Sequence, residues 1–171
     1  MPLTQEEKIQ LYNYCLQHMN LAAMSLGSSN ARAASGGNLA FLEVSLGGQL
    51  VFREHAFSNS SSLGRALRAD FSPSVPQNRL GMVGVANGIR HANHTEPKLF
   101  ESFINAVRGG NGQDFDLIIL ASQLDCCASC VKNTLAAING IIGLLSLDAR
   151  SNLRFVVVEI NSARVREGHE F

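Results

Sequence analysis

Two short motifs in this chain carry residue types that bind and use a transition metal. His94-Thr95-Glu96 supplies an imidazole and a carboxylate, and Cys127-Ala128-Ser129-Cys130 begins 33 positions after His94. His94, Cys127 and Cys130 would give Zn²⁺ three ligands and leave a fourth position for water, as in catalytic zinc sites. Glu96 lies close enough to His94 to move the protons of that water. The sequence therefore predicts a zinc centre with Glu96 as its proton shuttle.

The order of these motifs resembles the H-x-E … P-C-x-x-C signature of the zinc-dependent nucleobase and nucleoside deaminase superfamily. Many members have a strand that ends in Thr-Leu-Glu-Pro-Cys-x-x-Cys, and residues 122–130 here read Ser-Gln-Leu-Asp-Cys-Cys-Ala-Ser-Cys. Leu124 matches the family's leucine, and Asp125 takes the place of its glutamate. Cys126 stands where the family has proline. We interpret Cys126 as a structural residue, and the alternative is that it acts as a further thiolate ligand.

The resemblance implies hydrolysis of an exocyclic amine, with cytosine in DNA or RNA as the expected substrate, as in toxin-type bacterial deaminases. Such toxins imply a cognate inhibitor protein. A deaminase of free nucleosides or nucleotides is the alternative, and the neutral net charge fits it. A third hypothesis is a binding module without catalysis, in which His91, His94, Cys127 and Cys130 form a closed structural zinc site.

The chemistry explains why these residue types are needed. Zn²⁺ lowers the pKa of its bound water, which makes hydroxide available at neutral pH. Glu96 would take a proton from that water, pass it to the ring nitrogen and later deliver one to the leaving amine. Cys127 and Cys130 stand at a predicted helix start, where backbone N–H groups stabilise thiolates.

Composition limits the functional classes. The chain has 171 residues and a formal net charge of zero, so no global field favours a polyanionic partner. The segment from Arg53 to Arg108 is mildly basic, and it includes Arg79 and Arg90. Three of the four cysteines are crowded together, which favours metal chemistry in a reducing compartment over a disulfide framework. We expect no leader and no membrane span, and therefore action in a cytosol, which need not be that of the producing cell.

The first half of the chain predicts a helix, a hairpin and a long loop. Thr4-Gln5-Glu6-Glu7 is a capping box, followed by a helix that Gly27 ends. Residues 39–46 and 49–53 alternate as two strands joined at Gly47-Gly48. Residues 54–93 read as a long connection placed to form one wall of a substrate cleft. The predicted apolar face of the first helix consists of Ile9, Tyr12, Leu16, Met19, Ala23 and Leu26.

The second half predicts alternating helices and strands. A helix begins near His94, carries Phe100, Phe103, Ile104 and Val107 inward, and ends at Gly109-Gly110. Residues 115–121 are an apolar run typical of a central strand. A second helix runs from Cys127 to about residues 139–140, with Val131, Leu135 and Ile138 inward. Residues 141–147 and 153–160 read as the last two strands.

The element order is then α-β-β-α-β-α-β-β, within a single domain spanning residues 1–171. The link between the last two predicted strands is too short for a parallel crossover, so this pair should be antiparallel. The expected fold class is α/β, as a three-layer α/β/α arrangement of the cytidine-deaminase kind. Its sheet should have five strands in mixed directions and an antiparallel final pair. Within the superfamily, such a pair resembles the cytidine deaminases and many bacterial toxin deaminases.

Overall fold

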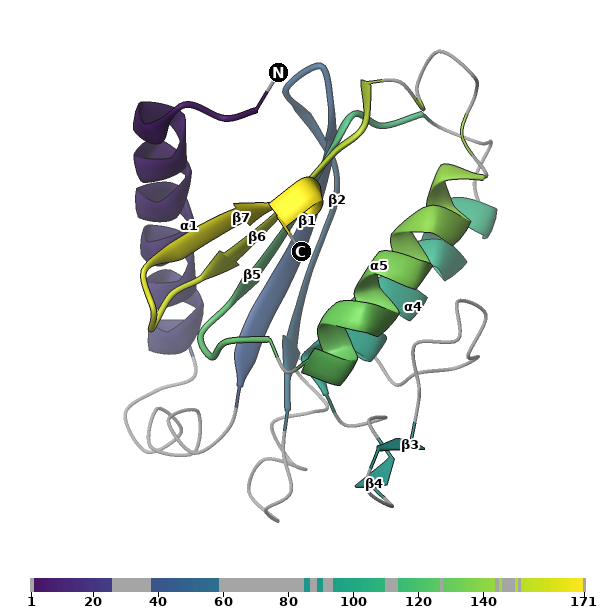
Figure 1. Ribbon diagram of the computed structural model, residues 1–171. Coiled ribbons are helices and arrows are strands. Elements are labelled where there is room, and N and C mark those ends of the chain that lie inside the picture. The colour runs from purple at the N-terminus through teal and green to yellow at the C-terminus, as the bar shows by residue number, and fades with distance from the viewer. Residues whose placement is uncertain are drawn as a thin grey trace.

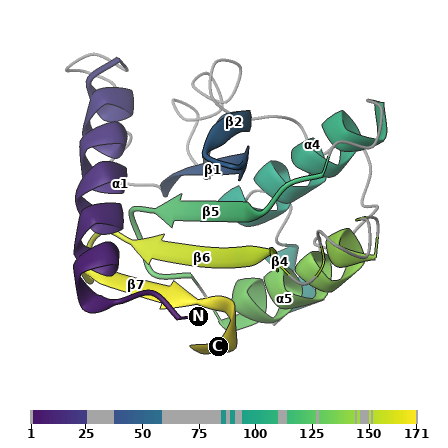
Figure 2. The same cartoon turned by 90° about the horizontal axis from the view of Figure 1, so that it is seen from above.

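The computed structural model describes residues 2–25, 38–58, 85–86, 89–90, 94–109, 114–126, 128–143, 145, 150 and 152–170. A five-stranded mixed sheet is covered by α1 on one face and by α4 and α5 on the other (Figures 1 and 2). The expected α/β class and five-stranded mixed sheet are therefore confirmed. The described elements are α1 (Gln5–Ser25), β1 (Leu39–Leu46), β2 (Gln49–Phe57), β3 (Val85–Ala86), β4 (Ile89–Arg90), α4 (Thr95–Gly109), β5 (Leu117–Ser122), α5 (Ala128–Ile142), β6 (Arg154–Glu159), β7 (Arg164–Glu167) and a 3₁₀ turn (Gly168–Glu170).

The strand order is β2-β1-β5-β6-β7, and β3 and β4 form a separate two-stranded sheet. β5 and β6 run parallel, joined by the crossover helix α5, while the other neighbouring strands are antiparallel. The parallel register pairs Ser122 with Glu159. The carboxyl ends of β5 and β6 therefore meet at one edge of the sheet.

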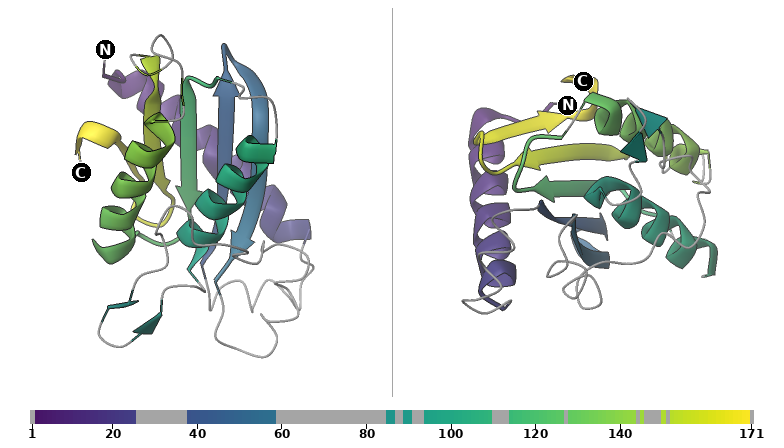
Figure 3. Two further views of the ribbon diagram at one scale, coloured as in Figure 1. Left: turned by 90° about the vertical axis from the view of Figure 1, so that its right-hand side faces the viewer. Right: turned by 90° about the horizontal axis from the view of Figure 1, so that it is seen from below.

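Two apolar cores fill the faces of the sheet, because successive strand residues point to opposite sides. Leu42, Leu120 and Val157 face α4 and α5, which lie side by side (Figure 3). Phe41, Ala121 and Val158 face α1. As expected, β5 is the central strand, and Phe100, Phe103 and Ile104 of α4 are fully buried.

The N-terminal capping box is present. The Thr4 N–H donates to Glu7 Oε2 at 2.7 Å, and the Glu7 N–H donates to Thr4 Oγ1 at 3.2 Å. The expected face of α1 is confirmed in part, since Met19 is 1% exposed and Tyr12 and Ala23 pack against the core. Ile9, however, is 52% exposed, whereas Cys15 is fully buried. The prediction followed the large apolar residues, but the closely packed positions of the helix are held partly by smaller side chains.

The glycine-linked hairpin is also confirmed. Gly47 and Gly48 have φ angles of 55° and 80°, a backbone region that favours glycine. The second strand is longer than expected, because β2 continues to Phe57. The predicted connection over residues 54–93 is therefore wrong in its first part. It also contains β3 and β4, and residues 59–84, 87–88 and 91–93 lie outside the described part of the chain.

The predicted strand over residues 141–147 is wrong. Helix α5 continues through Ile142, because Ile138 and Ile141 are both buried on its inner side, at 6% and 1% exposure. The final antiparallel pair is formed instead by β6 and β7. No helix among the described residues is long and apolar enough to cross a membrane.

Candidate active site

The Glu96 cluster is a group of polar side chains at the point where two helices begin. It consists of Asn38, Thr95, Glu96, Ser122, Cys126 and Glu159. Helix α4 starts at Thr95 and α5 starts at Ala128, and both starts lie near the carboxyl ends of β5 and β6 (Figure 1). Ligands of α/β sheets commonly bind outside the carboxyl ends of the parallel strands. Helix N-termini add a partial positive charge and unpaired N–H donors. This edge is therefore suited to holding thiolates and a catalytic carboxylate.

Glu96 occupies the first turn of α4 and is 4% exposed. The Thr95 hydroxyl lies 3.2 Å from Glu96 Oε2 and donates to it. The Cys126 side chain lies near the same carboxylate. Burial, followed by the nearby Glu96 and Glu159 carboxylates, raises the pKa of this thiol above its ordinary value. Cys126 therefore stands near the predicted proton shuttle as a neutral thiol.

Asn38, the residue before β1, joins both motif segments. Its side-chain Nδ2 lies 3.0 Å from Thr95 Oγ1 and 2.9 Å from Ser122 Oγ. Its Oδ1 accepts the Leu124 N–H at 3.0 Å. One side chain thus connects the start of α4 to the chain that leaves β5. These contacts hold the HxE segment against the segment that leads to Cys126.

Glu159 anchors the other side of the cluster. Its carboxylate is fully buried at the end of β6 and accepts the Cys126 N–H at 3.0 Å. Two arginines of β7 neutralise it, Arg164 at 2.7 Å and Arg166 at 2.8 Å. Each carboxylate oxygen therefore has a charged donor, and one oxygen also fixes the backbone next to the CxxC motif.

The structure describes some of the predicted site residues in full, and others only in part or not at all. His94 is half-buried at the bend that precedes α4. Cys130 belongs to the first turn of α5, but its side chain lies outside the described part, as do Cys127 and His91. Cys126 directly precedes Cys127, and Asn38 joins Thr95 to the Leu124 N–H in the segment before it, so the chain that leads to the CxxC motif lies beside the HxE motif. The set His94, Cys127 and Cys130 remains a prediction.

Several residues of this cluster could not be identified from the sequence. Asn38 immediately precedes a buried strand, whereas Ser122 and Glu159 are the last residues of β5 and β6. A polar residue that ends a buried apolar run is the signal that could have identified Ser122 and Glu159. Asn38 lies in a polar stretch with no comparable signal.

Arg53, the first residue of the predicted basic segment, lies away from the Glu96 cluster. Arg53 lies in β2 and forms an ion pair with Glu43 at 2.8 Å, on the α1 face of the sheet. Arg53 therefore does not belong to the Glu96 cluster. The Arg79 residue and the Arg90 side chain lie outside the described part of the chain.

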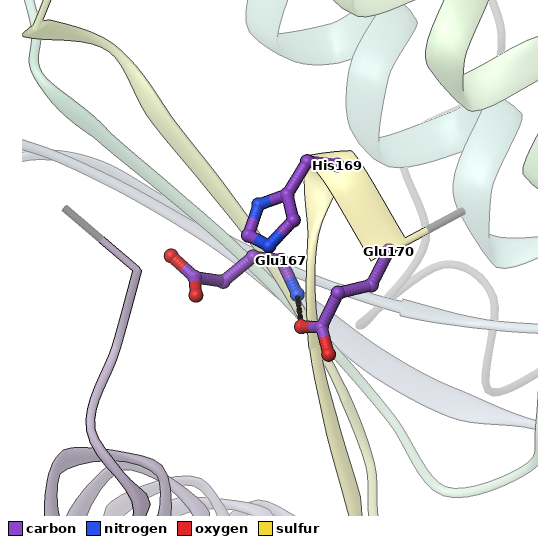
Figure 4. Close-up of side chains that lie close together, drawn as sticks. All are labelled: Glu167, His169 and Glu170. Carbon is purple, nitrogen blue, oxygen red and sulfur yellow. Dashed lines mark hydrogen bonds between the residues drawn. The ribbon is translucent and has the colours of Figure 1, made fainter.

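A second group of possible metal ligands occurs near the C-terminus, where Glu167, His169 and Glu170 lie close together (Figure 4). Glu167 accepts the Leu3 N–H at 2.7 Å, and Glu170 accepts the Glu167 N–H at 2.6 Å. Lys8 also forms an ion pair with Glu170 at 3.1 Å. We interpret this group as a clamp that holds the N-terminal segment to the end of β7.

A cleft of about 1250 Å³ lies next to this clamp. Ile138, Ile142 and Phe155 contribute apolar side chains to its lining, together with Arg154 and Glu167. Arg154 starts β6, so the cleft lies at the opposite end of that strand from Glu159. The cleft is therefore separate from the Glu96 cluster.

Comparisons with protein-family models, with curated proteins and with solved structures return no significant match to this chain.

Proposed function

We propose that this protein is a zinc-dependent hydrolytic deaminase that acts on cytosine in DNA or RNA, with a fold of the cytidine-deaminase kind. The Asn38 side chain carries the proposal, because it contacts Thr95 of the HxE motif and the Leu124 N–H, three residues before Cys127. It holds together two segments that lie far apart in the sequence, as a shared metal centre requires. The element order supports the fold, since α1, β1, β2, α4, β5, α5, β6 and β7 follow the order α-β-β-α-β-α-β-β once β3 and β4 of the separate two-stranded sheet are set aside. The antiparallel final pair adds to this support.

The donor set fits zinc. An imidazole and two thiolates are ligands that Zn²⁺ prefers, and three protein ligands are typical of catalytic sites. His94, Cys127 and Cys130 would hold the ion. When bound, Zn²⁺ supplies the acidification of water that hydrolysis at neutral pH needs. The start of α5 would stabilise the two thiolates through its N–H groups.

The protein's own residues would carry the proton transfers. In the balanced reaction, water adds oxygen to the ring carbon that bears the amine, and the amine leaves as ammonia. Glu96 would accept a proton from water, deliver it to the ring nitrogen and later protonate the leaving amine. The Thr95 hydroxyl would orient the Glu96 carboxylate without neutralising it.

Metal analysis tests the site directly. Purified protein should hold one Zn²⁺ per chain, which Cys127→Ala and Cys130→Ala should each lose. Cys126→Ala serves as the matched control and should keep the metal. Loss of zinc in Cys126→Ala would make Cys126 a ligand. Loss in His91→Ala, comparable to loss in His94→Ala, would favour the closed structural site over the deaminase.

A competition assay tests the substrate. Cytosine in oligonucleotides should be deaminated faster than free cytidine. The oligonucleotides are single-stranded, because a base in a duplex is out of reach. The preference rests on the basic residues that precede HxE. Arg79→Ala and Arg90→Ala should therefore weaken polynucleotide turnover more at low salt than at high salt. Faster turnover of cytidine, unaffected by these changes, would indicate a nucleoside deaminase.

A further inference from the structure

The orientation of the Asn38 amide is fixed by a backbone group. Side-chain amide oxygen and nitrogen are assigned from their partners, and a backbone N–H can only donate. The Leu124 N–H lies 3.0 Å from Asn38 Oδ1, which therefore must be the oxygen. The amide nitrogen of Asn38 then faces Thr95 Oγ1, at 3.0 Å.

This orientation sets the direction of the next hydrogen bond. The Asn38 amide nitrogen has no lone pair to accept with, so Thr95 Oγ1 must accept from it. A hydroxyl has one proton, and the Thr95 proton is then available to Glu96 Oε2, 3.2 Å away. The hydrogen bonds therefore run in one direction, from the Asn38 amide to the Thr95 hydroxyl and from there to the Glu96 carboxylate. Thr95 is fully buried, so solvent does not compete for its hydroxyl.

We propose that Asn38 and Thr95 form a directional hydrogen-bond chain that positions the Glu96 carboxylate. Thr95 is a positioning residue in this chain, since it acts on the reaction through Glu96. The inference rests on the proposed deaminase function for its catalytic consequence. The hydrogen-bond direction itself does not depend on that function.

The kinetic test compares two substitutions at one position. Thr95→Val keeps the branched shape and removes the hydroxyl, whereas Thr95→Ser keeps the hydroxyl and serves as the matched control. A hydrogen bond to a charged group, lost in the transition state, corresponds to a roughly ten- to hundredfold fall in kcat. We expect this fall in Thr95→Val with zinc content and KM unchanged, and we expect Thr95→Ser to recover most of the rate.

A change at Asn38 tests the direction of the chain. Asn38→Asp keeps an acceptor for the Leu124 N–H but removes the donor to Thr95 Oγ1. The Thr95 hydroxyl should then turn toward the new carboxylate and away from Glu96. The double variant Asn38→Asp with Thr95→Val should be no slower than the slower single variant, because both changes remove the same hydrogen bond.

A spectroscopic measurement separates this inference from the proposed function. The NMR signal of the Glu96 side-chain carboxyl carbon can be assigned by its absence in Glu96→Gln. At fixed pH, it should move in Thr95→Val and stay in place in Thr95→Ser. An unmoved signal in Thr95→Val would overturn the proposed hydrogen-bond chain, even in a protein without activity. An active wild type with unchanged kcat in Thr95→Val would also overturn it, whereas an inactive wild type would count against the deaminase alone.

Discussion

Glu43 and Glu96 are buried carboxylates that belong to opposite faces of one sheet, and their partners differ in kind. Glu43 is 7% exposed and receives the Arg53 guanidinium at 2.8 Å and the Tyr14 hydroxyl at 2.8 Å. Glu96 receives the Thr95 hydroxyl at 3.2 Å and lies near the neutral Cys126 thiol. A cation neutralises the first carboxylate, while a neutral donor holds the second. The difference separates a carboxylate used for stability from one suited to proton transfer.

The positions of Glu43 and Glu96 in the fold also differ. Glu43 lies along β1 in the cluster that connects α1 to β2, where His18 Nε2 and His55 Nε2 lie 3.1 Å apart. Glu96 lies in the first turn of α4, beside the segments that leave β5 and enter α5. Side chains between a helix and the middle of a sheet are held on all sides. Ligands of α/β sheets commonly bind outside the carboxyl ends of the parallel strands, which is the edge where Glu96 lies.

The largest expected effect is on activity, in Glu96→Gln. This change keeps the shape and hydrogen-bonding capacity of the side chain but removes its ability to shuttle protons. Activity should fall roughly 10²–10⁴-fold, the usual contribution of general acid–base catalysis. Zinc content and melting temperature should stay close to those of the wild type. Turnover and metal analysis on the same preparation measure both results, and retained activity would refute the proposed role of Glu96.

Glu43→Gln should give the opposite result, with lower stability and unchanged turnover. The change removes the negative partner of Arg53, and hydrogen bonds to charged groups contribute about 1.5–3 kcal/mol. Urea unfolding should therefore show a loss of this size. Tyr14→Phe is the matched control, because it removes one partner of Glu43 while leaving the ion pair, and it should cost less. A loss of activity in Glu43→Gln without loss of stability would contradict the division between the two faces.

Parts of the fold with a local cause could be predicted from the sequence. The capping box of α1 depends on Thr4 and Glu7, three residues apart, and the hairpin depends on two adjacent glycines. The central strand β5 is an uninterrupted apolar run. In each case the interacting residues are close in sequence or share one simple environment, so the pattern carries the information.

Parts of the fold that depend on tertiary packing could not be predicted. Strand β7 reads Arg-Val-Arg-Glu, which lacks an apolar pattern because two of its charged residues contact Glu159 and a third contacts Arg154. The C-terminal extension of α5 was assigned to a strand, although its apolar stripe continues past Gly140. A glycine costs about 1 kcal/mol in a helix interior, which burial of Ile141 can offset.

In the candidate site, too, local sequence patterns predict some residues and not others. The motif residues His94, Glu96, Cys127 and Cys130 are predicted because their types and spacing suit zinc chemistry, and their role as a metal site stays a prediction. The residues that hold the described part of the site are Asn38, Ser122 and Glu159, which come from three separate strand ends. Their roles arise from the register of β1, β5 and β6, which the sequence does not display.

A smaller effect is expected at the start of α1. Thr4→Ala removes the acceptor of the Glu7 N–H and should cost about 1 kcal/mol of stability, as other N-cap substitutions do. Thr4→Ser keeps the hydroxyl and should melt close to the wild type. Turnover should be the same in both variants, because the cap lies on the α1 side of the sheet. Thermal unfolding with parallel activity assays measures the outcome, and a reduced kcat in Thr4→Ala would contradict the separation of the two faces.

The smallest expected effect is a pH dependence from the His18–His55 pair. Burial is the first cause that lowers the pKa of both imidazoles below 6.5, and Arg53 adds to it while Glu43 opposes it. The proximity of His18 further lowers the pKa of His55.

Between the folded pKa and the unfolded value of about 6.5, the unfolded chain therefore binds more protons. The contribution of the pair to stability is fully present above about pH 6.5 and is lost as the pH falls through the folded pKa. The melting temperature should fall between pH 7.5 and pH 5.5, and it should fall less in His18→Gln and His55→Gln than in the wild type. Thr4→Ala should keep the full difference, because the cap contains no histidine. An equal fall in all of these proteins would show that the α1-face pair does not contribute to the pH dependence of stability.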